Sequence, residues 1–444
     1  MTSPGARSTT PIIGPTALAV LALGGYVKGS RYLAWIPVDL TILAGAVVLV
    51  VVLWTLAVRR RPGGSPVPLL LWFATLTSGL LSSSSPENTY ASQKVIHVFV
   101  LAPLCVMGGL VLLDSPRGRR SWLRSVVAVG FVTIALALVD PAGSTSRLYS
   151  EGGSTIGLGR AAGGALVVLL TVALTRRKHR EFALLLAFVA GYVVLRTASR
   201  GPVLASVLAV LAVVALSRTS GRIWRTLLVL LLLALGGAWA ASGGADSRLF
   251  ETAGASAEMR GMLLRYAVDA ALHHPLGIGW GGLYDYMGFA TLDSGYVQYP
   301  HNVIVEVASE GGWAAGAATC AALAVALGRQ WRHQALPGEL AMTALLLFGL
   351  LNALVSGDVN GNRGLWVAIG AALAAQMRAP AQGPPGQDPQ GGIAQRPSRS
   401  ESSDRHRGGP RQVVAQNDDT GAQNEAEHVP ARLPRHLAHH HDGL

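Results

Sequence analysis

Residues 40–61 read LTILAGAVVLVVVLWTLAVRRR, an apolar run that ends in three consecutive arginines. A run of about 20 apolar residues has the length of a helix that crosses the hydrocarbon core of a bilayer. Inside that core no water is present to hydrogen-bond the backbone, so a spanning segment of this kind must be helical. We therefore expect a membrane helix here, followed by a basic loop.

The composition of the whole chain extends this interpretation. Of its 444 residues, 50% are hydrophobic and only 14% are charged, whereas a soluble globular protein carries roughly 25% charged residues. The apolar residues fall in long blocks, as in a polytopic membrane protein of the all-α class. We predict twelve spans, near 12–27, 35–58, 67–83, 93–113, 121–139, 156–175, 181–197, 201–217, 223–241, 301–327, 339–357 and 364–378.

The net charge of +12 is explained by topology and does not indicate a nucleic-acid partner. Basic clusters follow every second predicted span, at 59–61, 117–120, 176–180, 218–225 and 329–332. Short loops rich in arginine and lysine remain on the cytoplasmic side. An even number of spans then predicts a multi-pass protein of the cytoplasmic (inner) membrane, surrounded by its lipids, with both termini in the cytoplasm.

Two polar stretches interrupt or follow the predicted spans. Residues 242–300 form a large predicted extracytoplasmic loop, with an amphipathic helix near 256–273 that ends before Pro275. From residue 379 to residue 444 hydrophobic periodicity is lost, and this tail is expected to be disordered and cytoplasmic. The sequence thus predicts one transmembrane domain, 1–378, and a tail. Cys105 and Cys320 both fall in spans, which argues against a disulfide or a cysteine metal site.

Four arginines lie on the predicted outer side, where the topology rule disfavours them: Arg196, Arg200, Arg260 and Arg265. A guanidinium group presents a planar fork of donors that matches phosphate oxygens. Several such groups near the lipid headgroups suit a lipid-linked diphosphate. The alternative is that Arg196 and Arg200 extend only to the headgroups themselves.

The segment 299–316, YPHNVIVEVASEGGWAAG, begins a predicted span with polar residues. A neutral imidazole at an apolar boundary can take a proton from a hydroxyl, so His301 is a candidate general base. Helical spacing would place one polar stripe toward a cavity, formed by Asn302, Glu306, Ser309 and Trp313. A structural interpretation is equally open, in which His301 caps the helix and Glu306 and Glu310 pair with arginines of the outer loop.

Two glycine patterns in the second half of the sequence have structural explanations. GIGWGG, residues 277–282, matches the spacing of dinucleotide-binding loops, but no predicted strand precedes it, as that motif requires. Gly312 and Gly316 form a GxxxG pattern, which we interpret as a site of close helix packing.

Three stretches resemble the O-antigen ligase and polymerase superfamily, bacterial membrane glycosyltransferases that use undecaprenyl-diphosphate-linked glycans. PHNVIVEVASEGGWAAG (300–316) resembles its His-Asn…Glu-x-Gly…Gly signature. MRGMLLRYAVDAALHHPLGIGWGGLYDY (259–286) is similar to its Arg-x₃-Trp…His-Pro-Leu-x-Gly-x-Gly stretch, and ASRGPVLASVLAVL (198–211) to its Ser-Arg-Gly element. The resemblance covers residues 180–377.

The resemblance implies a role for each matching residue. His301 would be the catalytic base, and Arg200 and Arg260 would bind the diphosphate. From their position on the predicted outer side we add Arg196 and Arg265 as further candidates for diphosphate binding. Asn302, Glu306 and Glu310 would support the site. The implied reaction moves a glycan from a polyprenyl diphosphate carrier to a hydroxyl of a glycan or lipid acceptor, on the outer face of the cytoplasmic membrane, in the assembly of a cell-surface polysaccharide. We expect it to need no metal ion or cofactor. Whether the protein is a ligase or a polymerase stays open.

Two other functions fit parts of the sequence. A proton-coupled transporter would use His301, Glu306, Glu310 and Asp358 as an ion path, but these residues cluster at one boundary, whereas transporter sites lie near the midplane. A membrane scaffold would act through the tail at 379–444.

Overall fold

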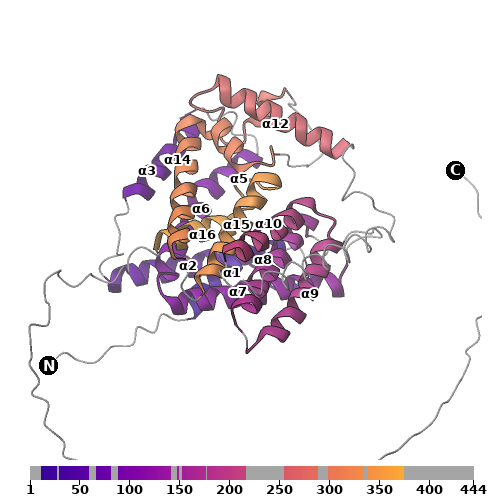
Figure 1. Cartoon of the computed structure of the whole chain (residues 1–444). Helices are drawn as coiled ribbons and strands as arrows, with labels where there is room; N and C mark the ends of the chain where they lie inside the picture. Colours follow the sequence, from indigo (N-terminus) through magenta and orange to yellow (C-terminus); the bar gives the residue numbers. More distant parts are fainter. Residues whose placement is uncertain are drawn as a thin grey trace, which may run out of the picture. The chain divides into compact units, whose positions relative to one another are not determined.

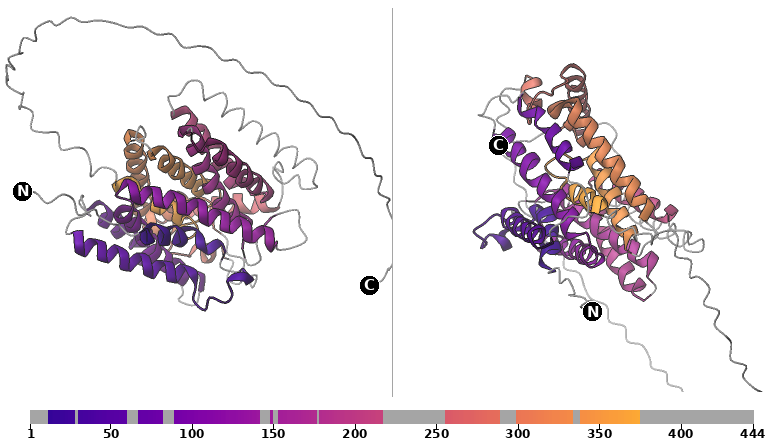
Figure 2. Two further views of the ribbon diagram at one scale, coloured as in Figure 1. Left: turned by 90° about the horizontal axis from the view of Figure 1, so that it is seen from below. Right: turned by 90° about the vertical axis from the view of Figure 1, so that its left-hand side faces the viewer.

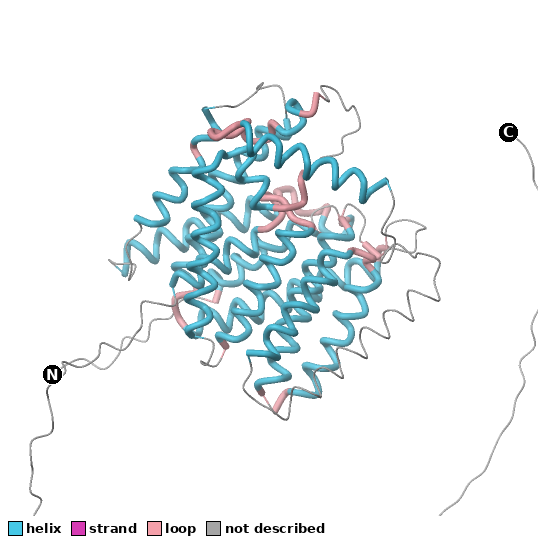
Figure 3. Tube along the Cα trace, turned by 45° about the horizontal axis from the view of Figure 1, so that its top comes forward, coloured by secondary structure: helices cyan, strands magenta, loops and turns pink. Residues whose placement is uncertain are grey.

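The computed structural model describes residues 12–27, 30–59, 67–81, 89–141, 148–149, 153–176, 178–216, 255–288, 299–333 and 338–374. The regular elements in these ranges are all helices (Figure 3), which confirms the all-α class. The predicted span 223–241 and the tail 379–444 lie outside the described residues, as do 242–254 and 289–298 of the predicted outer loop.

The helices are labelled as in Figure 1. They are α1 (Ile13–Leu23), α2 (Leu40–Arg59), α3 (Val67–Leu76), α4 (Ser78–Leu81), α5 (Thr89–Ile96), α6 (Ala102–Leu112), α7 (Pro116–Val139), α8 (Thr155–Thr175), α9 (Arg180–Arg196), α10 (Arg200–Leu216), α12 (Ala255–His273), α13 (Leu283–Tyr286), α14 (Val303–His333), α15 (Glu339–Val355) and α16 (Arg363–Ala374). A π-helical turn, His97–Leu101, joins α5 to α6.

Serine side chains fix where two of the long helices begin. Ser115 Oγ accepts a hydrogen bond from Gly118 N (3.0 Å) at the start of α7, and Ser154 Oγ accepts one from Gly157 N (2.9 Å) at the start of α8. A cap of this kind satisfies one of the backbone N–H groups that the first turn leaves without a partner. Each helix therefore begins directly after its serine.

Helices lie at every predicted span within the described residues. Five segments are long and apolar enough to cross a bilayer: Leu40–Val58, Tyr90–Leu112, Pro116–Val139, Thr155–Thr175 and Val303–Arg332. Shorter apolar helices occur at Ile13–Tyr26, Leu69–Leu81, Arg200–Ala215, Glu339–Val355 and Arg363–Ala374. The count of twelve spans and the side of each terminus stay predictions.

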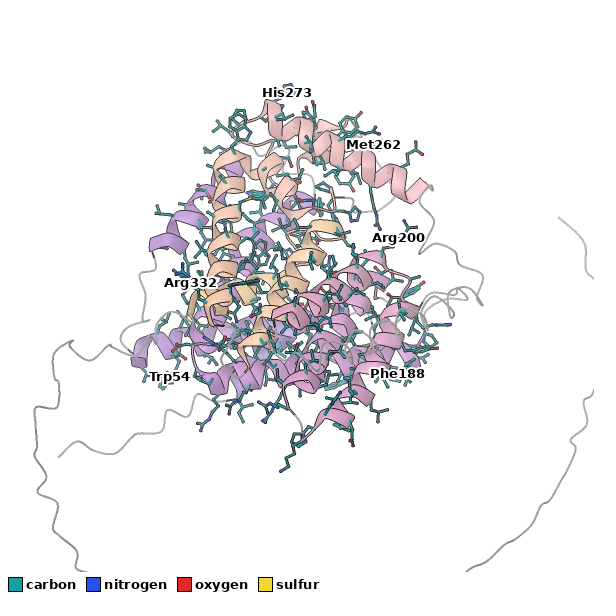
Figure 4. The ribbon with its side chains drawn as sticks, in the orientation of Figure 1. Trp54, Phe188, Arg200, Met262, His273 and Arg332 are labelled. Carbon is teal, nitrogen blue, oxygen red and sulfur yellow. The ribbon has the colours of Figure 1, made fainter. Side chains whose placement is uncertain are left out.

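The helices differ in what surrounds them, as expected for a bundle in lipid. Helix α8 is central, with 89% of its span buried among α7, α9, α10 and α15. On α2 and α9, by contrast, large apolar side chains point outward, including Trp54 (69% exposed) and Phe188 (61% exposed) (Figure 4). Apolar surface of this kind is stable where the solvent is hydrocarbon.

Helix α14 is broken at Gly312, which has φ 86° and ψ 174°. The segment after α12, residues 274–282, passes close to this point. A Cβ on residue 312 would lie 2.6 Å from Pro275 O, so only glycine leaves room for the segment. That segment repairs the break, because Ile278 N donates to Ser309 O (2.9 Å) and Gly279 N donates to Glu310 O (3.1 Å). The unbroken span predicted at 301–327 is therefore two helical pieces. The sequence analysis interpreted Gly312 as part of a GxxxG pattern for close helix packing. In the structure it also gives room to the backbone of the segment after α12.

The break also changes which residues of α14 share a face. Glu306 and Ser309 are fully buried, whereas Trp313 is 54% exposed and donates through Nε1 to Ala271 O (2.5 Å). The predicted stripe from Asn302 to Trp313 is thus wrong, because helical spacing does not continue across Gly312. The buried part of the stripe contacts protein and does not face an open cavity.

Helix α12 packs against α14 (Figure 1). It does so through a buried face that includes Leu263, Ala267 and Ala270. Further along, α14 packs against α3 from the N-terminal half, and the right-hand view of Figure 2 shows the orange helix running beside purple ones. The amphipathic helix predicted at 256–273 is therefore confirmed as α12, and it lies close to the first half of α14.

Candidate functional site

His301 immediately precedes the residue that caps α14. Asn302 Oδ1 accepts hydrogen bonds from Ile304 N (3.1 Å) and Val305 N (3.2 Å), which is the bonding of an N-cap. Capping therefore belongs to Asn302, and the interpretation of His301 as the cap is wrong. His301 has φ 56°, a left-handed conformation that costs a non-glycine residue roughly 1–3 kcal/mol and is concentrated at functional sites.

The surroundings of His301 hold its imidazole in the neutral form. Its ring lies against that of Tyr299, with centroids 4.4 Å apart, and its buried Nδ1 has no hydrogen-bond partner among the described residues. Burial, together with the positive charges of Arg260 and Arg160, lowers the pKa of His301 to about 4, while Asp358 opposes the shift. Burial also raises the pKa of the Tyr299 hydroxyl. At neutral pH the imidazole is uncharged and able to accept a proton.

Arg260 and Arg265 lie on different faces of α12. Arg260 is half-buried, on the side of Leu263 and Ala267, and its charge acts on His301. Arg265 is exposed, because five residues turn a helix by about 140° beyond one full revolution. The structure thus brings Arg260 to His301 and leaves Arg265 on the opposite side of the helix.

Arg196 and Arg200 flank the turn between α9 and α10. Arg196 ends α9, and Arg200 is the first residue of α10, where its side chain is exposed (Figure 4). Between them Ala198 has φ 49°. Ala198 and His301 are the non-glycine residues with positive φ in the described part of the chain. Each lies in one of the sequence stretches, 198–211 and 300–316, that resemble the family. A Cβ on Gly201 would lie 2.3 Å from Ser356 Cβ, so the start of α10 abuts the loop that follows α15.

That loop, residues 356–362 with the sequence SGDVNGN, connects several elements of the site. Arg160 of α8 donates to Ser356 O (2.7 Å) and to Gly361 O (2.9 Å). The loop carries Asp358, which acts on His301. Sequence reasoning missed Arg160, although an arginine inside a predicted apolar span is a signal of a buried partner.

A buried ion-pair cluster, Lys94 with Glu306 and Glu310, lies behind the first turns of α14. Lys94 Nζ is 2.6 Å from Glu306 Oε1 and 2.5 Å from Glu310 Oε2. The predicted pairing of these glutamates with arginines of the outer loop is therefore wrong. Their supporting position, behind the start of α14, is compatible with the sequence interpretation. Lys94 was missed as a site residue, although a lysine at the edge of a predicted span was the available signal.

The arrangement combines three chemical properties. His301 provides a neutral base, and the positive charges of Arg260 and Arg160 act on it. Arg200 lies exposed at the start of α10, which abuts the 356–362 loop. Positive charge beside a base suits a substrate that loses a proton at one atom while negative charge develops on another. A phosphate-bearing leaving group has that character.

One family model matches the chain, over residues 182–320, and it is described as O-antigen ligase. The match runs from α9 into α14 and includes Arg200, Arg260 and His301, whereas Lys94, Arg160 and Asp358 lie outside it. It confirms the resemblance that the three sequence stretches indicated, and with the apolar helices it identifies an integral membrane protein. No curated protein matches the chain.

Proposed function

We propose that this chain, which matches the O-antigen ligase family model over residues 182–320, transfers a glycan from a polyprenyl diphosphate carrier to an acceptor hydroxyl. The transfer would take place on the outer face of the cytoplasmic membrane, during assembly of a cell-surface polysaccharide. The observation that carries the proposal is His301, a neutral imidazole with a buried Nδ1, whose pKa is lowered by the charge of Arg260.

In the proposed step one bond forms and one breaks at the anomeric carbon of the donor glycan. The acceptor oxygen attacks that carbon, and His301 takes the proton of the acceptor hydroxyl. The bond from the anomeric carbon to the diphosphate oxygen breaks, and the diphosphate leaves with the electron pair. A single displacement inverts the configuration at this carbon. A diphosphate is a good leaving group, so the step needs no carboxylic acid and is written without a metal ion.

The arginines would stabilise the charge that grows on the departing diphosphate. For Arg260 the support is that its charge lowers the pKa of His301. For Arg200 the support is its exposed position next to the 356–362 loop. Arg196 is a weaker candidate at the end of α9. Arg265 projects from the opposite side of α12, so the geometry favours Arg260 over it.

Binding of the donor would prepare His301 for its task. Without substrate, burial and two guanidinium groups hold its pKa at about 4, which makes the imidazole a weak base. A bound diphosphate brings negative charge to those arginines and thereby raises the pKa of His301 toward its ordinary value. The base would become effective only when the donor is present.

Reconstitution tests the reaction itself. The full-length protein in liposomes, given a polyprenyl-diphosphate-linked glycan and an acceptor glycan or lipid, is expected to release one polyprenyl diphosphate for each glycan transferred. Proton-coupled movement of a solute without any glycan product would contradict the proposal and favour a transporter, which the family match does not support. Transfer to another repeat unit would identify a polymerase, and transfer to a different molecule a ligase.

A further inference from the structure

The Lys94 cluster is almost completely removed from solvent. The side chains of Lys94 and Glu306 are 0% exposed and that of Glu310 is 2% exposed. Lys94 also lies over the ring of Tyr90, with Nζ 5.4 Å from the ring centroid. A single cation thus holds two carboxylates in an apolar part of the bundle, where such a pair persists only with good geometry and further hydrogen bonds.

Those further hydrogen bonds come from two segments of the site. Glu306 Oε2 accepts from Val359 N (2.9 Å), next to Asp358 in the 356–362 loop. Glu310 Oε2 accepts from Gly281 N (3.0 Å), in the segment that follows α12 and repairs the break in α14. Each carboxylate therefore ties Lys94 to a different backbone segment.

The segment after α12 also touches α5 directly. Gly281 has φ 82°, and a Cβ there would lie 2.7 Å from Ala91 Cα, one helical turn before Lys94. The close approach leaves no room for a side chain between the segment and α5. Lys94 consequently stands where α5, α14, the segment after α12 and the 356–362 loop meet.

We propose that Lys94 is a positioning residue for glycan transfer, acting through Glu306 and Glu310. It does not touch the reacting groups. It holds the first turns of α14, which follow His301, in fixed relation to the loop of Asp358 and to the segment that continues from the helix of Arg260. This inference rests on the proposed function, and it assigns a role in that function to a residue outside the matched domain.

The direct test compares Lys94→Met with wild type, as full-length protein reconstituted in liposomes. With rates expressed per folded molecule, we expect kcat to fall about 100-fold, the effect of displacing a reacting group by about 1 Å. The KM for the lipid-linked donor should change less than about threefold, because the residue does not contact it. Lys94→Arg keeps a cation between the carboxylates, so its kcat should be at least about tenfold higher than that of Lys94→Met.

Arg119→Met is the matched control, because Arg119 forms a buried ion pair with Glu339 between α7 and α15. This variant should lose thermal stability much as Lys94→Met does. Its kcat should stay within about threefold of wild type, because a rate per folded molecule does not depend on the free energy of unfolding. A Lys94→Met protein with the wild-type kcat per folded molecule would overturn the inference. If wild type itself transfers no glycan, the proposed function fails instead.

A second variant decides the matter if Lys94→Met does not fold. Glu310→Gln keeps the volume of the side chain and an oxygen that can accept from Gly281 N, but it removes one ion pair. We expect kcat to fall at least about tenfold with the folded amount preserved. An unchanged kcat in this variant would equally overturn the positioning role.

Discussion

Two clusters of buried polar side chains differ in how many of their atoms have hydrogen-bond partners. In the first, Arg119 pairs with Glu339 and donates from Nε to Leu113 O (2.8 Å), while Gln330 Nε2 donates to Glu339 Oε2 (3.1 Å). In the second, around His301, the buried Nδ1 atom of His301 and the buried Nε atom of Arg160 on α8 have no hydrogen-bond partner among the described residues.

The difference shows that the polar atoms around His301 are less completely hydrogen-bonded than those around Arg119. A buried polar atom without a partner costs free energy, and evolution retains it chiefly where something else supplies the partner. The Arg119 cluster is complete and needs nothing more. Around His301 a buried ring nitrogen without a hydrogen-bond partner, a positive φ and a strongly lowered pKa coincide, and this combination makes His301 the candidate that the proposed function uses.

Among three substitutions outside His301 itself, Arg260→Ala is expected to have the largest effect. Removing a donor that stabilises developing negative charge should lower kcat/KM by roughly 10²- to 10³-fold. Arg265→Ala is the matched control on the exposed face of the same helix, and transfer assays should find it close to wild type. Equal losses in the two variants would mean that the faces of α12 do not differ in function.

An intermediate effect is expected from Gly312→Ala. The backbone conformation at residue 312 costs a side-chain-bearing residue roughly 1–3 kcal/mol, and the new Cβ would also press against Pro275 O. We expect a lower melting temperature and a lower rate per folded molecule, because the segment after α12 is displaced. Gly328→Ala provides the comparison within α14, since no heavy atom lies within 4 Å of a Cβ built there. A Gly312→Ala protein as stable as Gly328→Ala would refute the account of the break.

The smallest effect is expected from Asp358→Asn. Its carboxylate raises the pKa of His301 against the larger opposing causes, so its removal should lower that pKa below about 4. The base is active only when neutral, and activity is lost as the pH falls through its pKa. The acidic limb of kcat/KM, which reports the free enzyme, should therefore move to lower pH, with little change at pH 7. A shift to higher pH would contradict the assignment.

Much of the helical framework follows from the sequence because it depends on local hydropathy. Apolar runs predicted the described helices at the proposed spans, an amphipathic pattern predicted α12, and Pro275 marked the end of α12 within two residues, whereas the short helix α13 was not predicted. The separation of Arg260 from Arg265 was also present in the sequence, since helical periodicity alone places them on different faces. The motif around residue 301 identified the candidate base.

The remaining features depend on contacts between distant segments. Lys94 meets Glu306 across more than 200 residues of sequence, and no local pattern indicates such a pair. The break at Gly312 is stable only because residues 275–279 supply replacement hydrogen bonds. Arg160 is held by carbonyl groups of a loop after α15, so its partners carry no side-chain signal.

The most direct test of the central claim is the transfer rate of His301→Ala at saturating donor, per folded molecule. Loss of a general base should lower kcat by roughly 10²- to 10⁴-fold, and added imidazole should recover part of the rate by occupying the vacated space. His273→Ala, which removes an exposed imidazole of α12, should leave transfer unchanged. A His301→Ala protein that transfers glycan at the wild-type rate would contradict the account.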